Sequence, residues 1–119
     1  MQSFRNLKVW QKAHALTVDV YKATNAFSKE ELYGLTSQLR RASVSVGANI
    51  AEGSCRRGDA DFGRFLQMAI GSASEVVYHV LLARDLEMLK TMDYQRLSAQ
   101  VVEVKRMLGA LLGKLRADG

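Results

Sequence analysis

Residues 94–115 have the sequence YQRLSAQVVEVKRMLGALLGKL. Its apolar side chains recur three and four positions apart without a miss, at Tyr94, Leu97, Val101, Val104, Leu108, Leu111 and Leu115. This spacing gathers them into one narrow stripe along a helix, which is the a/d pattern of helices that pack against one another. The stretch therefore predicts a long amphipathic helix whose apolar stripe faces the core of a bundle.

The same spacing occurs three more times toward the N-terminus. The further stripes are Val9, Ala13, Leu16, Val20 and Ala23; Leu32, Leu35, Leu39, Ala42 and Val46; and Phe62, Leu66, Ala69, Ala73, Val76, Val80 and Ala83. The chain has no proline, so nothing in it breaks long helices. We expect helices near residues 6–25, 29–54, 59–89 and 92–116. The predicted fold is all-α, an up-down antiparallel four-helix bundle that forms one domain over residues 1–119.

The predicted helix boundaries depend on local capping chemistry. Ser28 and Glu31 have the spacing of a capping box, and Phe27 and Leu32 have that of the accompanying hydrophobic staple, which predicts a helix start at residue 29. The glycine-containing stretch 53–59 is the longest irregular piece, and its last residue, Asp59, is the expected N-cap of the third helix. A very short turn near residues 89–91 makes the last two helices antiparallel neighbours.

The size and composition of the chain exclude several classes of protein. Its 119 residues, 48% of them hydrophobic, are typical of one ordinary globular domain. The single cysteine, Cys55, cannot form an internal disulfide, which favours a reducing, cytoplasmic setting. Basic residues interrupt the N-terminal apolar stretch, and no run of about 18 apolar residues occurs. We therefore expect neither a signal peptide nor a membrane span.

Positive charge is in excess, because 17 lysines and arginines face 12 aspartates and glutamates, for a formal charge of +5. Such an excess favours an anionic partner such as nucleic acid or an acidic protein. Guanidinium groups bind phosphate oxygens without reading bases. The candidate phosphate contacts are Lys8, Lys12, Arg40, Arg56, Arg57 and Arg64. A solvated basic face that only aids solubility is an equally weighted interpretation.

Polar residues also recur at helical spacing along one side of the second and third helices. They are Gln38, Arg41, Ser45, Asn49 and Glu52, followed by Ser72 and Glu75. The favoured interpretation is a buried network of ion pairs and amides, in which Arg41 pairs with Glu52 or Glu75 and which fixes helix register or a subunit contact. Such a network predicts that Arg41→Ala costs several kcal/mol. The alternative is a polar binding groove.

Residues for catalysis or metal binding are scarce. The chain offers Cys55 as a nucleophile and His14 and His79 as the imidazoles, with no active-site motif around any of them. Glu75 and His79 are four residues apart, which does not match the paired Glu-x-x-His pattern of di-metal bundles. We expect no catalytic residue, no metal site and no cofactor.

Four stretches carry a family resemblance: residues 4–13, 33–42, 49–53 and 65–75. In order and over essentially the whole chain, they closely resemble the four-helix-bundle family of ribosomal RNA intervening-sequence proteins. That family includes the accessory variability protein of diversity-generating retroelements. The resemblance implies an up-down bundle that assembles as a homopentameric ring with a central channel and has no enzymatic activity.

The resemblance also implies partners. The retroelement relatives are basic, bind nucleic acid with little sequence preference and associate with a reverse transcriptase, whereas others are encoded inside ribosomal RNA genes. Arg41, Asn49, Glu52 and Glu75 occupy motif positions of the family. We therefore expect a non-catalytic oligomeric scaffold that binds RNA or DNA backbone and recruits a nucleic-acid enzyme or a ribosomal RNA component. The alternative is a protein-interaction module with an acidic protein partner.

Overall fold

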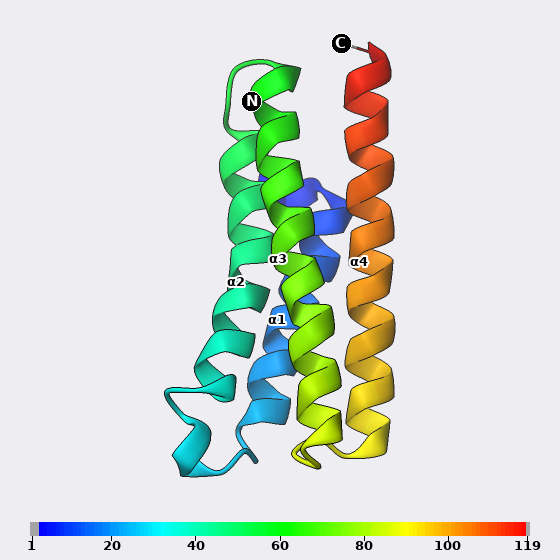
Figure 1. Cartoon of the computed structure of the whole chain (residues 1–119). Coiled ribbons are helices and arrows are strands. Elements are labelled where there is room, and N and C mark those ends of the chain that lie inside the picture. The colour runs from blue at the N-terminus through cyan, green and yellow to red at the C-terminus, as the bar shows by residue number, and fades with distance from the viewer. Residues whose placement is uncertain (1–2, 119) are drawn as a thin grey trace.

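The computed structural model describes residues 3–118, so residues 1, 2 and 119 of the predicted domain lie outside the description. Its elements, in chain order, are the 3-10 turn η1 (Phe4–Asn6), α1 (Lys8–Thr24), the 3-10 turn η2 (Lys29–Glu31), α2 (Leu35–Ser54), α3 (Asp59–Asp85) and α4 (Thr91–Asp118). Within this range no strand occurs, and consecutive helices run in opposite directions (Figure 1). Both α1 and α3 pack against α2 and α4. The predicted up-down four-helix bundle is confirmed, and it measures 45 × 21 × 20 Å.

The predicted apolar stripes form the core of this bundle. Leu16, Leu39, Leu66 and Leu97, one from each helix, are fully buried, as is Leu108 farther along α4. Burying side chains of this size contributes about 1.5–3 kcal/mol each. The sequence pattern therefore identifies the inward face of each helix correctly.

The far end of the α4 stripe is less covered. Leu111 and Leu115 are half-buried, although they continue the spacing that buries Leu108. Figure 1 shows that α1 begins below the C-terminal end of α4, so this end of α4 packs against α3 without α1 beside it. A hollow of about 980 Å³ lies there between the two helices, lined in part by Gly63, Leu112 and Leu115.

The predicted helix over residues 29–54 is wrong at its start, because α2 begins only at Leu35. Ser28 forms no capping bond with its side chain. The carboxylate of Glu31 accepts a hydrogen bond from the backbone N–H of Leu35 at 3.1 Å, so it caps the later helix instead of closing a capping box with Ser28. Leu32 is 46% exposed, although the predicted staple would bury it against Phe27.

The third helix ends at Asp85, four residues before the predicted boundary. Glu87 adopts a left-handed conformation with φ of 60°. The N–H of Met88 donates to the carbonyl of Ala83, and that of Glu87 donates to the carbonyl of Arg84. This is the Schellman arrangement that satisfies the last carbonyls of a helix, usually with glycine at the left-handed position. At the other end, Gly58 takes the N-cap position predicted for Asp59, with φ of 89°.

Among residues 3–118, α3 has the length and mean hydropathy that would allow a helix to cross a membrane. The core helix of a soluble protein satisfies the same test, so this is weak evidence for a membrane span. Here α3 packs against both α2 and α4, with Leu66, Val76 and Val80 inside the bundle.

Candidate functional site

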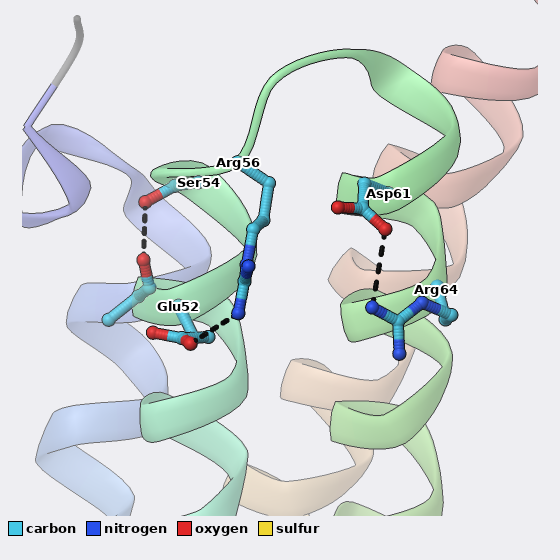
Figure 2. A network of polar contacts seen from close by, with 6 residues as sticks. Glu52, Ser54, Arg56, Asp61 and Arg64 are labelled. Atoms are coloured by element: carbon cyan, nitrogen blue, oxygen red, sulfur yellow. Dashed lines mark hydrogen bonds and ion pairs between the residues drawn. The ribbon is translucent and has the colours of Figure 1, made fainter.

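Three of the predicted phosphate-contacting arginines, Arg56, Arg57 and Arg64, lie at the connection between α2 and α3, and Figure 2 shows Arg56 and Arg64. Arg56 pairs with Glu52 at 2.6 Å, and Arg64 pairs with Asp61 at 3.2 Å. The guanidinium carbons of both arginines lie within 4.9 Å of the centroid of the Phe65 ring. Each arginine is thus oriented by a carboxylate on its own side of the connection and by the same aromatic ring.

The α2–α3 connection has little net charge of its own. Besides the two ion pairs, it carries Arg57 and Asp59, and both side chains are exposed. Within residues 3–118 neither of them has an ion-pair partner. Arg57 is therefore the arginine of this connection whose charge is least committed to the protein itself.

Arg40 has an internal role in the structure. Its Nε donates to the hydroxyl of buried Thr24 at 2.7 Å, and its Nη2 donates to the side-chain carbonyl of Asn25 at 3.2 Å. The guanidinium also lies over the ring of Tyr21, 4.6 Å from its centroid. These contacts tie α2 to the C-terminal end of α1, so Arg40 is the predicted phosphate contact whose donors are most engaged within the fold.

A second group of basic side chains lies where α1 meets α4. Lys8 and Lys12 are exposed on α1, and Arg106 is exposed on α4. Arg106 donates to Glu103 at 2.8 and 3.1 Å. This hydrogen bond, together with the positive charges of Arg106 and Lys12, holds the pKa of the Glu103 carboxyl below its ordinary value. We call Lys8, Lys12 and Arg106 the α1–α4 basic face, because Lys12 and Arg106 both act on the Glu103 carboxyl and Lys8 lies one turn before Lys12 on α1.

The predicted buried ion pairs of Arg41 are wrong, whereas hydrogen bonds among Ser45, Asn49 and Ser72 do form. Arg41, Glu52 and Glu75 are exposed, and Glu52 pairs with Arg56. Within the part of the chain that the structure describes, Arg41 has no ion-pair partner. The reason is that α2 and α3 bury alanines and leucines between them, which leaves the polar side chains along the outer edge of the contact.

The polar residues instead line a groove of about 350 Å³ along that edge, formed by Gln38, Arg41, Ala42, Ser45, Ser72 and Glu75. The hydroxyls of Ser45 and Ser72 are hydrogen-bonded at 2.9 Å across the two helices. Asn49 donates to the backbone carbonyl of Ser45 at 2.9 Å and to its hydroxyl at 3.1 Å. Six of the residues predicted as a network are therefore neighbours, and Glu52 is not one of them.

The residues considered for catalysis have separate surroundings. His14 is exposed on α1 and stacks on Trp10, with ring centroids 4.8 Å apart. His79 is buried on α3 beside Tyr78, and Cys55 is exposed at the end of α2. Among residues 3–118, no three His, Cys, Asp or Glu side chains are grouped closely enough to hold a metal ion.

Comparisons with known proteins agree with the bundle. The crystal structure of a protein with unknown function from the S23 ribosomal protein family, from Bacteroides thetaiotaomicron, is similar to this chain with a TM-score of 0.78. The two share 25% sequence identity over 87% of this chain and 97% of that one. No curated protein matches the sequence. The model of the 23S rRNA-intervening sequence protein family matches residues 5–110. The fold, the order of its helices and this match over most of the chain show that the protein belongs to the 23S rRNA-intervening sequence protein family.

Proposed function

We propose that this protein is a non-catalytic, homo-oligomeric scaffold that binds the backbone of RNA or DNA without strong sequence preference. In this proposal the oligomer is a pentameric ring that acts in the cytoplasm and recruits a nucleic-acid enzyme, such as a reverse transcriptase, or a ribosomal RNA component. The family membership and the formal charge of +5 support it. It requires no cofactor.

The α1–α4 basic face is the observation that carries the proposal. Arg56 and Arg64 pair with Glu52 and Asp61, whereas Lys8, Lys12 and Arg57 have no ion-pair partner within residues 3–118. Unpaired lysines on a rigid helix release counterions when they bind phosphates, which is the main source of affinity for a nucleic-acid backbone. We therefore propose Lys8, Lys12 and Arg57 as the principal phosphate contacts, with Arg56 and Arg64 as secondary contacts.

Incompletely covered apolar surface supports self-association. Leu115 borders the 980 Å³ hollow between α3 and α4, and Val102 is 56% exposed on α4. A second copy of the chain would cover such surface and remove it from water. The expected mass in solution is that of five chains, which light scattering after size-exclusion chromatography measures directly.

The test of backbone binding is fluorescence anisotropy of labelled single-stranded RNA and duplex DNA over a salt series, with nuclease-treated protein. Backbone binding predicts an affinity that falls steeply with salt and differs little between sequences. The variant Lys8→Gln/Lys12→Gln is expected to lower the slope of log affinity against log salt by about 1.8 on duplex DNA, at roughly 0.9 per lost contact.

The matched control is Arg56→Gln/Arg64→Gln, which removes the same formal charge but from arginines that already pair with carboxylates. We expect this variant to change the slope less than the lysine variant does. Equal slopes for the two variants would remove the α1–α4 basic face from the proposal. Absence of binding at low salt would refute the nucleic-acid role and favour an acidic protein partner on the same face.

A further inference from the structure

The groove between α2 and α3 has the features of a small binding site. Its lining combines the short, less exposed side chains of Ala42, Ser45 and Ser72 with the longer, exposed polar side chains of Gln38, Arg41 and Glu75. The volume of about 350 Å³ is at the lower end of the range for small-molecule sites. The hydrogen bond between Ser45 and Ser72 holds the two helices together beneath the groove.

The groove contains opposite charges that do not neutralise each other. The five ion pairs within residues 3–118 all join residues close in sequence, and neither Arg41 nor Glu75 belongs to any of them. A cation and an anion that line one hollow without pairing are both available to a ligand. The carboxylate of Glu75 repels phosphate, so the nucleic-acid backbone does not suit this groove. The ligand must offer hydrogen-bond donors to Glu75 and an acceptor to Arg41.

We propose that the groove binds the base of an unpaired guanine. Guanine presents two adjacent donors, N1–H and the 2-amino group, which match the two oxygens of the Glu75 carboxylate. Beside them lie the acceptors O6 and N7, which arginine binds in the most frequent specific contact with this base. Adenine, cytosine and uracil each lack this pair of adjacent donors next to an acceptor. The hydroxyls of Ser45 and Ser72 and the amide of Gln38 offer further donors and acceptors within the groove.

An exposed aromatic ring next to the groove supports a base as the ligand. Tyr78 is 59% exposed and follows Glu75 by three residues on α3, so its side chain lies one turn farther along the same helix face. Exposed aromatic rings provide stacking surfaces for unpaired bases, and base–aromatic stacking does not depend on the sequence. The guanine edge would bind in the groove while an adjoining base stacks on Tyr78.

This inference rests on the proposed binding of nucleic acid and adds a base-reading subsite to it. Backbone contacts at Lys8 and Lys12 provide affinity for any sequence, whereas the groove gives single-stranded RNA with an accessible guanine an advantage. Paired guanine is excluded, because its N1–H and 2-amino group already bond to cytosine. Single-stranded loops and ends are the substrates that present such a base.

The experiment uses the full-length protein and the nucleotides GMP, IMP and AMP, which carry the same phosphate and differ only in the base. Binding is followed by the chemical shifts of backbone amides in the groove during titration. We expect GMP to shift the amides of Ser45, Ser72 and Glu75. IMP lacks the 2-amino group and loses one hydrogen bond to a charged acceptor, so it should bind about tenfold more weakly. AMP should bind most weakly.

Variants identify the groups that recognise the base. Glu75→Gln and Arg41→Gln are each expected to abolish the preference for GMP over AMP, and both side chains are exposed, so the fold should be kept. Glu30→Gln is the matched control, because Glu30 is another exposed carboxylate without an ion-pair partner in the described residues. A GMP preference that survives Glu75→Gln, equal binding of GMP and AMP, or absence of shifts in the groove would each overturn the inference.

A polymer measurement separates this inference from the proposed function. Anisotropy compares a uridine oligomer carrying one central guanine with the same oligomer carrying adenine. Tighter binding of the guanine oligomer that Glu75→Gln removes, with the salt slope unchanged, supports the groove. Equal binding of both oligomers refutes the groove but leaves backbone binding intact. Failure of both oligomers to bind refutes the proposed function. In that case the GMP titration alone shows whether the groove binds guanine.

Discussion

Gly53 of α2 lies directly against Phe65 of α3. A β-carbon on Gly53 would sit 2.6 Å from the β-carbon of Phe65 and 2.9 Å from a ring carbon of Phe62. Both distances are shorter than real side chains tolerate, and the nearer atom is one that a change of rotamer does not move. The lack of a side chain at Gly53 therefore lets α2 and α3 approach closely next to the connection that carries Arg56, Arg57 and Arg64.

Gly53→Ala is therefore expected to destabilise the protein. Overpacking typically costs about 1–3 kcal/mol, which exceeds the gain of roughly 1 kcal/mol from replacing glycine inside a helix. Gly47→Ala is the control on the same helix, because its added methyl group would make an ordinary contact 3.6 Å from Nε1 of Trp10. Urea unfolding should show a lower free energy of unfolding for Gly53→Ala and no decrease for Gly47→Ala. Equal changes in the unfolding free energy of the two variants would contradict the close approach of α2 and α3 at Gly53.

The adjacent residues Arg40 and Arg41 are expected to differ sharply in their contribution to stability. Arg40→Gln removes the hydrogen bonds to Thr24 and Asn25 and the contact with Tyr21, which should cost about 2 kcal/mol. Arg41→Gln alters an exposed side chain without an ion pair in the described residues and should stay within about 0.5 kcal/mol. Thermal unfolding of both variants measures the difference. A large loss for Arg41→Gln would restore the network interpretation that the structure contradicts.

The spacing of apolar residues was sufficient to predict the fold, because a stripe such as Leu97, Val101, Val104 and Leu108 can be buried only on one helix face. The helix ends were harder to predict. The sequence pattern predicts a capping box between Glu31 and Ser28, but the Glu31 carboxylate accepts a hydrogen bond from the N–H of Leu35. Competing capping partners a few residues apart differ little in energy, so local sequence does not choose between them.

The candidate site was predicted only in part, for a reason that concerns side-chain placement. Helical spacing correctly grouped Gln38, Arg41 and Ser45 on one side of α2 and predicted Ser72 and Glu75 as their neighbours on α3. Spacing does not tell whether such a row of side chains points between the helices or along their outer edge. A small rotation of a helix about its own axis converts one orientation into the other. Likewise, the sequence does not distinguish Arg40, which bonds to Thr24, from its neighbour Arg41.

Two buried threonines give a further pair of contrasting predictions. The hydroxyl of Thr36 is buried without a hydrogen-bond partner in the described residues, whereas that of Thr24 donates to the carbonyl of Val20 at 2.8 Å and accepts from Arg40. Thr36→Val keeps the shape and removes an unsatisfied polar group, so it should stabilise the protein by about 1 kcal/mol. Thr24→Val leaves a charged donor without its acceptor and should cost about 2 kcal/mol. The free energies of unfolding are measured in denaturant. A similar loss of unfolding free energy in both variants would contradict the different hydrogen bonding of Thr36 and Thr24.

The pair of Glu103 and Arg106 on the α1–α4 basic face predicts a small pH dependence of stability. The hydrogen bond from Arg106 holds the pKa of the Glu103 carboxyl below its ordinary value of 4.5. The folded protein therefore binds this proton less readily than the unfolded chain does, and the pair stabilises the fold above the ordinary pKa. This contribution is lost as the pH falls through the lowered pKa of the folded state.

Arg106→Gln is expected to raise the pKa of Glu103 back toward 4.5, which the carboxyl carbon shift measures during a pH titration. Because Lys12 also lowers this pKa, Lys12→Gln should raise it by a smaller amount. Arg96→Gln is the control, since Arg96 pairs with Asp93 at the same i,i+3 spacing on α4 and should leave Glu103 unchanged. A Glu103 titration that Lys12→Gln does not move would show that α1 and α4 do not bring these charges together, and the α1–α4 basic face would lose its physical basis.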